Sequence, residues 1–364
     1  MQIQELLERI SADRAVAPDA VFARLTRLLA APAPANSCTL PGTVGPVIQQ
    51  LAGELGLRGA PVGSSGNLAI EIGDAAAPLD LLISAHMDRP CFRVRDAADG
   101  TLYPLCAIRV PGDGYTCGAV GLRYVDGRVR VITSGVMRFD LAGGDTRIHY
   151  QPESGELRHG DTLMMRVTPG LDAGRIIGTG LDNAIGVLLA LLAAYALGKH
   201  APDAIAGRRL LFAFTDQEEG PPIGLFGQGA LRLAHNLEPP RLGFINIDGH
   251  NVDEGAGHVL GVGASHAFVS GDGRGSVLPM DAQALAESLA EQVNRARPGT
   301  VRPNYSYISR SDDMLLSTWA RPLGLCGVIA ANAHTTEETA ALSDIVSAAH
   351  WIPLLVTTIL YAEV

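Results

Sequence analysis

The chain lacks several patterns that would assign it to particular classes of protein. No run of Lys or Arg stands out, and 28 basic against 38 acidic residues give a formal net charge of -10, which argues against nucleic acid as a partner. The longest apolar runs, residues 184–198 and 351–362, are shorter than the roughly 18 residues that a membrane span needs. The N-terminus is polar and has no signal-peptide profile. We therefore expect a cytoplasmic protein with no nucleic-acid or membrane partner.

Cysteine is scarce as well, and its spacing is uninformative. The five cysteines are odd in number and form no Cys-x-x-Cys pair, so reduced cytosolic thiols are the simplest interpretation. They are Cys38, Cys91, Cys106, Cys117 and Cys326.

A length of 364 residues exceeds what one core usually holds, and 47% hydrophobic residues indicate a large core. Two domains are therefore expected.

The pattern of apolar, polar and turn residues changes twice along the sequence. Residues 89–176 contain short alternating segments, such as 121–131, with Asp-Gly and Gly-Gly turns at close intervals, which is typical of β-structure. On either side, apolar strands alternate with helices, the signature of an α/β sandwich. The sequence thus predicts an α/β domain made of residues 1–88 and 177–364, with a β-rich domain of residues 89–176 inserted.

Four apolar segments of the α/β part lead into metal-type side chains. The segments are 79–85, 209–214, 242–247 and 325–331. The side chains that follow them are His86, the pair Glu218 and Glu219, Asp248, and His334. Open α/β sheets bind ligands at the carboxyl ends of their strands, so these side chains are expected to meet there.

The first segment ends in His86-Met87-Asp88. Asp88 is close enough in sequence to hydrogen-bond the far ring nitrogen of His86, which would select the tautomer that a metal-bound imidazole needs. Taken alone, the pair is equally compatible with a solvated or structurally hydrogen-bonded histidine.

Asp182 precedes the strongly apolar segment 184–197, which predicts a buried helix. The residue stands where an N-cap belongs, and capping is the simpler interpretation. A carboxylate at a helix N-terminus could also bridge two cations with its two oxygens.

Glu218 and Glu219 stand at a strand-to-loop bend, before a turn built from Gly220, Pro221 and Pro222. Such a bend lets one glutamate bind metal while the other takes a proton from the metal-bound water. A solvated acidic turn is the alternative.

Each of these simpler interpretations is plausible for its own residue. All of them would have to be true at once if the chain had no metal site, so the whole set favours a two-metal hydrolase site. Imidazole and carboxylate ligands suit Zn, and also Mn or Co, and the lack of cysteine in the set argues against a closed structural zinc site.

The ordered motifs resemble the glutamyl aminopeptidase and tetrahedral aminopeptidase family of co-catalytic metallopeptidases, from about residue 21 to the C-terminus. The motifs are His86-Met87-Asp88, Leu181-Asp182, Glu218-Glu219, Asp248 and His334. The resemblance implies a three-layer α/β sandwich with a mixed sheet, of the phosphorylase/hydrolase-like zinc-peptidase type, and a small inserted β-barrel-like domain. It implies Asp182 as the bridging ligand, Glu218 as general base, and His86, Glu219, Asp248 and His334 as the remaining ligands. Which carboxylate pairs with which imidazole stays open.

The chain departs from the family pattern around the ligands. Asn183 replaces the usual second Asp, Arg89-Pro90-Cys91 replaces Glu-Ile-Gly, residues 331–333 replace Arg-Tyr-x, and residues 220–224 lengthen the turn after the glutamates. These departures concern the substrate pocket and indicate a divergent member. Arg310 falls where the family lines its specificity pocket, although a surface charge is the commoner role of such an arginine.

The expected function is that of a two-metal aminopeptidase, which hydrolyses N-terminal residues of short peptides through a metal-bridging water with Glu218 as general base. Zinc is the expected metal, with cobalt or manganese as alternatives. One other possibility is a two-metal amidohydrolase that acts on a non-peptide amide, and another is a non-catalytic assembly protein that kept the fold. In the family such insertions build oligomers, so a homo-oligomer is expected.

Overall fold

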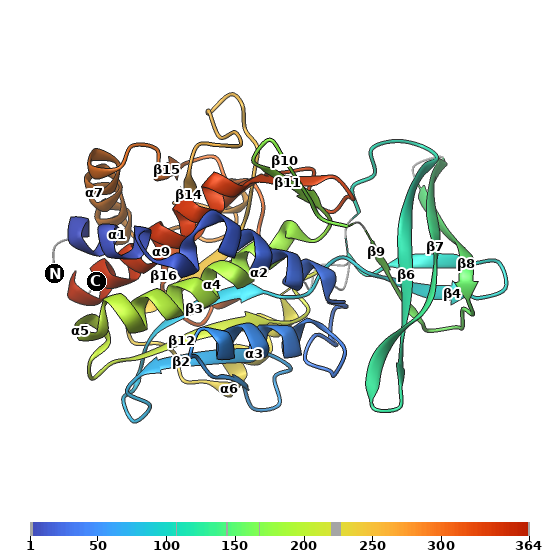
Figure 1. The fold of residues 1–364 in the computed structure, drawn as a ribbon, viewed down its shortest axis with the longest axis horizontal. Coiled ribbons are helices and arrows are strands. Elements are labelled where there is room, and N and C mark those ends of the chain that lie inside the picture. The colour runs from blue at the N-terminus through green and yellow to red at the C-terminus, as the bar shows by residue number, and fades with distance from the viewer. Residues whose placement is uncertain (1–2, 107, 143–144, 167, 220–226, 363–364) are drawn as a thin grey trace.

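The structure, a computed structural model, describes residues 3–106, 108–142, 145–166, 168–219 and 227–362. It contains a body of helices around an 11-stranded mixed sheet and, to the right in Figure 1, a separate closed barrel of antiparallel strands. The α/β sandwich with an inserted barrel-like domain, expected from the sequence, is confirmed.

The mixed sheet runs in the order β1-β2-β12-β3-β13-β16-β17-β11-β10, with β14 and β15 beside β16. Its centre is parallel, because β12, β3, β13 and β16 pair in the same direction. The bounds of its strands are β1 Gly59–Pro61, β2 Leu68–Gly73, β3 Leu79–His86, β10 Gly170–Asp172, β11 Arg175–Gly178, β12 Arg209–Thr215, β13 Gly243–Asn251, β14 Ala264–Ala267, β15 Val301–Asn304, β16 Pro322–Ala331 and β17 Glu338–Ala341. All four central strands therefore end at one edge.

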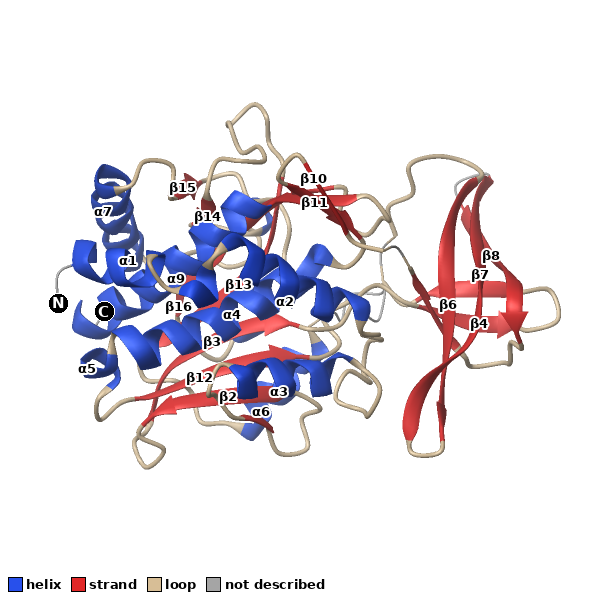
Figure 2. Cartoon of the chain, in the orientation of Figure 1, coloured by secondary structure: helices blue, strands red, loops and turns tan. Residues whose placement is uncertain are grey.

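Helices cover both faces of this sheet (Figure 2). Along β12, Leu210, Phe212 and Phe214 belong to the larger apolar cluster, while Leu211 and Ala213 belong to a second one, as the alternation of a strand requires. The larger cluster includes α1, α2, α4 and α9, and the second includes α6 and α8. The helices are α1 Ile3–Ser11, α2 Pro18–Ala30, α3 Val44–Glu54, α4 Leu181–His200, α5 Pro202–Ile205, α6 Gln228–Asn236, α7 Met280–Ala296, α8 Asp313–Leu316 and α9 Leu342–Ala362, with 3-10 turns Arg14–Val16 and Gly271–Gly273.

Two helices, α4 and α9, are long and apolar enough to cross a membrane by length and composition. In the most apolar stretch of each helix, 83% of the residues of α4 and 72% of those of α9 are buried inside the fold. They are core helices here, and the buried helix expected after Asp182 is confirmed.

The barrel closes in the order β4-β5-β8-β7-β6-β9. Its strands are β4 Phe92–Asp96, β5 Thr101–Pro104, β6 Tyr115–Val125, β7 Arg128–Ala142, β8 Asp145–Gly155 and β9 Thr162–Met165. It has its own core, in which Phe92 packs edge-on against Phe139 with the ring centroids 5.9 Å apart. The following strands β10 and β11 return to the mixed sheet, where β11 pairs with β17.

Asp13 ties the N-terminal helices to α4. Its buried carboxylate accepts hydrogen bonds from the Ala15 backbone N–H at 2.9 Å and from the Tyr195 hydroxyl at 3.1 Å. It also lies 2.8 Å from Lys199 Nζ and 2.7 Å from His200 Nε2. Burial alone would raise the pKa of Asp13, but these partners outweigh it and hold the pKa well below its usual value.

We expect Asp13→Asn to lower the free energy of unfolding at pH 7 by ~1–3 kcal/mol, because an amide cannot replace the charge-assisted bonds. A depressed folded-state pKa contributes stability above the unfolded pKa of about 3.9, and that stability is lost as pH falls below it. Denaturant unfolding of both proteins should therefore converge as the pH is lowered through 4. Asp19→Asn, which breaks an exposed ion pair with Arg14, is the matched control and should change little. Equal losses in the two variants would contradict the role of Asp13.

Candidate active site

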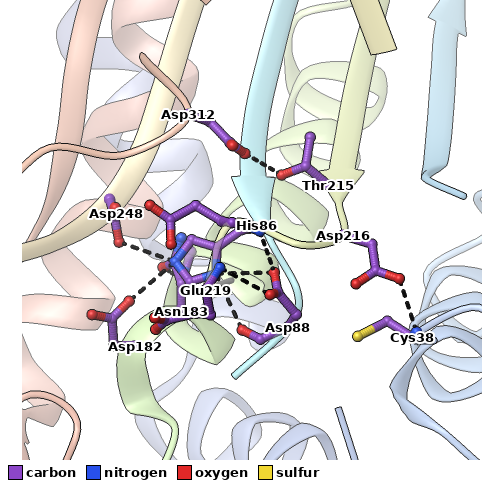
Figure 3. A network of polar contacts seen from close by, with 12 residues as sticks. Cys38, His86, Asp88, Asp182, Asn183, Thr215, Asp216, Glu219, Asp248 and Asp312 are labelled. Atoms are coloured by element: carbon purple, nitrogen blue, oxygen red, sulfur yellow. Dashed lines mark hydrogen bonds and ion pairs between the residues drawn. The ribbon is translucent and has the colours of Figure 1, made fainter. Parts of the chain in front are cut away.

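The presumed ligands meet at the edge where the parallel strands end, and Figure 3 shows four of them, His86, Asp182, Glu219 and Asp248. His86 is the last residue of β3, and Asp248 lies in the C-terminal half of β13. Glu219 follows β12, His334 follows β16, and Asp182 stands at the start of α4. Residues far apart in sequence thus reach one cluster because neighbouring parallel strands end side by side.

The two imidazoles share the Asp182 carboxylate, and each has one further carboxylate beside it. Nε2 of His86 lies 3.1 Å from Asp182 Oδ1 and 3.6 Å from Asp248 Oδ1. Nε2 of His334 lies 3.0 Å from Glu219 Oε1 and 3.7 Å from Asp182 Oδ2. The two oxygens of Asp182 therefore face different imidazoles, with Asp248 on the side of His86 and Glu219 on the side of His334.

The cap of α4 differs from the expectation. The backbone of Asp182 and of Asn183 is non-helical, and a cis peptide bond joins them. Asn183 is the residue that caps, because its Oδ1 accepts a hydrogen bond from the Gly186 backbone N–H at 2.9 Å. Its amide nitrogen donates to Ile247 O on β13 at 2.7 Å. The assignment of the N-cap to Asp182 is therefore wrong, and the Asp182 carboxylate is left to face the two histidines.

Asp88 acts on the glutamates more than on His86. Its Oδ1 and Oδ2 accept hydrogen bonds from the backbone N–H groups of Glu218 and Glu219, each at 3.0 Å. Nδ1 of His86 lies 3.1 Å from the Asp88 carbonyl oxygen but 3.7 Å from its carboxylate. The expected carboxylate–imidazole hydrogen bond is replaced by one to the backbone, because the carboxylate is already occupied by the glutamate loop.

Glu338 binds the backbone of Asp182 and His334 as Asp88 binds that of the two glutamates. Its side chain is 1% exposed, and its two oxygens accept hydrogen bonds from Asp182 N at 3.1 Å and His334 N at 2.9 Å. His334 has a φ of 65°, a left-handed conformation that costs of order 1–3 kcal/mol in a non-glycine residue. The bond from Glu338 is one contact that holds this backbone in place.

Burial shifts the pKa values of the carboxyl groups upward. It raises the pKa of Glu338 to about 8, of Asp312 to about 7 and of Asp248 to about 6. Burial also raises the pKa of Glu218 well above its usual value; the nearby His86 opposes this shift, and Glu219 adds to it.

Asp182 and the histidines shift the other way. Burial opposes ionisation of Asp182, but contacts with His334 and His86 outweigh it and lower the pKa of Asp182 below its usual range. For both imidazoles burial is likewise outweighed, chiefly by Glu218 for His86 and by Glu219 for His334. The pKa of His334 rises to about 12. The raised pKa values of both imidazoles thus reflect the negative charge gathered around them.

The donor set fits divalent cations. Donor atoms of His86, Asp182 and Glu219 lie within 4.8 Å of one another. Glu219 is 4% exposed, and its Oε1 lies 3.0 Å from His334 Nε2. A buried carboxylate is costly unless a positive charge compensates it, so the site as a whole is built for positive charge.

The structure brings in residues that the sequence did not indicate. Asp312 accepts a hydrogen bond from the Thr215 hydroxyl (Figure 3), and Glu338 joins as described. Cys106 Sγ forms a second donor group with Glu219 and His334, again within 4.8 Å. A cysteine thus lies beside two of the presumed ligands, which the sequence did not indicate. Nothing in the spacing could place Cys106, because it precedes β6 of the barrel and is remote in sequence from every ligand.

Arg310 is exposed, and its aliphatic stem lies beside Gly271. Its position beside Ser311, which interacts with the Asp248 carboxylate, puts it near the rim of the cluster. A substrate-binding role for Arg310 stays a prediction. The lengthened turn of residues 220–224, with Pro221 and Pro222, lies outside the described residues.

Comparison with known proteins identifies the fold. No protein-family model matches the chain, and no curated protein matches its sequence. Among solved structures, a TET aminopeptidase from a marine sediment archaeon of the Thaumarchaeota superposes with a TM-score of 0.74 at 14% identity, over 93% of this chain and 96% of that one. The chain has the fold of the TET aminopeptidases. The family resemblance inferred from the motifs is thereby confirmed in the architecture.

Two further structures share the TET fold. The Pyrococcus horikoshii TET1 peptidase, described as assembling into a tetrahedron or a large octahedral shell, has a TM-score of 0.67 at 18% identity, over 92% of this chain and 98% of that one. A dodecamer of yeast aminopeptidase 1 from Saccharomyces cerevisiae has a TM-score of 0.62 at 14% identity, over 95% of this chain and 98% of that one.

The pKa shifts predict how the metal-free protein responds to pH. Carboxyl groups with raised pKa values, such as Glu338 at about 8 and Asp312 at about 7, bind protons in the folded state that the unfolded state does not bind. An imidazole with a raised pKa, such as His334 at about 12, contributes stability that is lost as pH rises above the unfolded value of about 6.5. Both kinds of group therefore lower the free energy of unfolding as the pH rises.

In the presence of a chelator, we expect the thermal unfolding midpoint to fall as pH rises from 6 to 8. One pH unit on one fully shifted group corresponds to ~1.4 kcal/mol. The Glu338→Gln variant should show a flatter dependence, because one of the titrating groups is removed. A midpoint that rises with pH over this range would show that the cluster does not carry the charges described.

Proposed function

We propose that the chain is a two-metal aminopeptidase that acts on short peptides. The observation that carries the proposal is the position of Asp182, whose two oxygens face His86 at 3.1 Å and His334 at 3.7 Å. One carboxylate between two imidazoles, with a further carboxylate on each side, is the donor arrangement of a bridged pair of cations. The TET fold supports the proposal, and the proposal goes beyond it.

We assign His86 and Asp248 to one cation, His334 and Glu219 to the other, and Asp182 to both. Imidazole and carboxylate donors suit zinc, with cobalt or manganese as alternatives. Bound there, two cations would supply an activated water and polarise the scissile carbonyl.

Glu218 has the properties of the general base. It is buried beside the ligands, and burial raises its pKa well above the usual value, which makes its carboxylate a stronger proton acceptor. It takes a proton from the attacking water and returns it to the leaving amine. Asp88 is a positioning residue, because its carboxylate holds the backbone of both glutamates.

Substrate binding follows from the charge of the cluster. Several carboxylates gather at one end of the sheet, so the free α-amine of a peptide is attracted to this side. A requirement for that amine would make the enzyme exo-acting. Arg310 is the candidate partner for a substrate carboxylate.

The decisive experiment is metal analysis of the purified protein, followed by assays with each of Zn, Co and Mn added back. Aminoacyl-anilides test for aminopeptidase activity, and N-acyl amino acids test for a two-metal deacylase. About two equivalents of metal per chain with turnover of the anilides supports the proposal. Turnover of the acylated substrates alone would replace it with the deacylase, and no turnover of any amide would favour a non-catalytic assembly protein.

The adjacent glutamates should separate into a base and a ligand. Glu218→Gln keeps the size of the side chain but cannot accept the proton, so kcat should fall by about 10² to 10⁴ while metal content stays near wild type. Glu219→Gln replaces an anionic ligand with a neutral one, so metal binding should weaken first and excess metal should partly restore activity. Metal content and rate are to be measured on the same samples. Metal loss in the Glu218 variant alone would reverse the assignment.

We also propose that the protein is a homo-oligomer, because the TET peptidase and yeast aminopeptidase structures that share its fold are described as large assemblies. The cytoplasmic location expected from the sequence stays a prediction. The barrel of strands β4 to β9 stands apart from the α/β body (Figure 1) and offers exposed Tyr103, Tyr124 and Val131 for contacts between subunits.

Light scattering at micromolar concentration should therefore give a mass several times the 38.1 kDa of one chain. Tyr124→Asp with Val131→Asp should shift the distribution toward smaller species, because charges in an apolar contact cost desolvation. Leu171→Asp, which lies on the mixed sheet and is also exposed, is the comparison variant. A monomer in the wild type would contradict the proposal.

A further inference from the structure

Cys106 lies where the barrel meets the candidate active site. It belongs to the connection between β5 and β6, and its side chain is buried, with 6% exposed. Its Sγ, a carboxylate oxygen of Glu219 and a ring nitrogen of His334 lie within 4.8 Å of one another. The sulfur therefore stands beside the half of the site that contains His334, remote in sequence from both of its neighbours.

Contacts on both sides hold this connection against the site. Immediately before the cysteine, Leu105 N donates a hydrogen bond to Cys91 O at 2.9 Å, and the Leu105 side chain packs against the apolar cluster of the α/β body. At the start of β6, the hydroxyl of Tyr115 hydrogen-bonds that of Thr336, two residues after His334. The position of Cys106 is thus a product of the fold and not of a free loop.

A second observation points to a ligand at the same place. Glu219 Oε1 is buried, and the His334 ring nitrogen lies 3.0 Å from it, in the same donor group as Cys106 Sγ. A buried carboxylate, a thiol and an imidazole in one group are a donor set that a cation would hold together in place of the proton between Glu219 and His334.

We propose that Cys106 Sγ is a ligand of the cation held by Glu219 and His334, an inference that rests on the two-metal site proposed above. On binding, the S–H bond breaks, its proton passes to solvent, and a sulfur–metal bond forms. With Asp182 Oδ2, this half-site then has one sulfur, one nitrogen and two oxygen donors.

The two cations then differ in kind. The half-site of His334 has four protein donors, as closed zinc sites do, whereas His86, Asp182 and Asp248 provide three and leave a position open for substrate or water. A thiolate also favours zinc or cadmium over manganese. Because the cysteine comes from the barrel connection, metal retention becomes linked to the docking of the barrel.

Cobalt substitution tests the proposal, because a Co–thiolate bond gives a sulfur-to-metal charge-transfer band in the near ultraviolet that oxygen and nitrogen ligands do not give. The protein is stripped of metal, loaded with saturating Co²⁺, and measured for both cobalt content and absorption. The variants are Cys106→Ser and, as a matched control, Cys117→Ser, another buried cysteine that lies in the barrel core.

We expect about two equivalents of cobalt in the wild type, with the band present in the wild type and in Cys117→Ser and lost in Cys106→Ser. In a chelator competition, one of the two equivalents should bind more weakly in Cys106→Ser, by more than the ~10–100-fold that loss of an outer ligand partner costs. Two bound cobalt ions without the band, or a band that persists in Cys106→Ser, would overturn this inference and leave the two-metal site standing. A wild type that binds no cobalt would overturn both.

Discussion

The burial of many ionisable side chains at one end of the sheet is the constraint on which the rest of the site depends. His86, Asp182, Glu218, Glu219 and Asp248 all lie at the ends of buried strands or of a buried helix, where charge is poorly solvated. Contacts at 3.0 to 3.7 Å join Asp182, Asp248 and Glu219 to the two imidazoles. The cluster is therefore stable only as a set, and divalent cations would replace protons in the same balance.

Two carboxylates outside the proposed ligands organise this set. Asp88 binds the backbone of Glu218 and Glu219, and Glu338 binds the backbone of Asp182 and His334. Each therefore couples two positions of the site through backbone N–H groups and not through the ligand side chains. Preorganisation of this kind fixes the separation of donors before any ion or substrate binds.

The inserted barrel is more than a separate module. Its β5–β6 connection carries Cys106 to the site, and Tyr115 at the start of β6 contacts the loop after His334. The rest of the barrel has its own apolar core and stands away from the α/β body (Figure 1). One end of the barrel thus completes the site, while its exposed strands remain available for contacts between chains.

The sequence by itself determined the α/β architecture, the inserted β-domain and the order of the ligand-type residues. His86 at the end of β3, Glu219 after β12 and Asp248 in the C-terminal half of β13 are found from local pattern, because a parallel strand and its carboxyl end are set by a few adjacent residues. Local pattern failed at Asp182, where the neighbouring Asn183 supplies the helix cap and a non-helical backbone turns the Asp182 carboxylate toward the histidines.

Only the tertiary structure decided which carboxylate faces which imidazole, that Asp88 and Glu338 hold backbone groups, and that Cys106 lies beside His334. In the sheet, β3 lies between β13 and β12. This strand order cannot be predicted from the spacing of the motifs. Contacts such as Leu105 N to Cys91 O at 2.9 Å join segments through packing of whole elements. Side chains remote in sequence meet because the apolar faces of those elements have to be buried together, and that requirement depends on the whole chain at once.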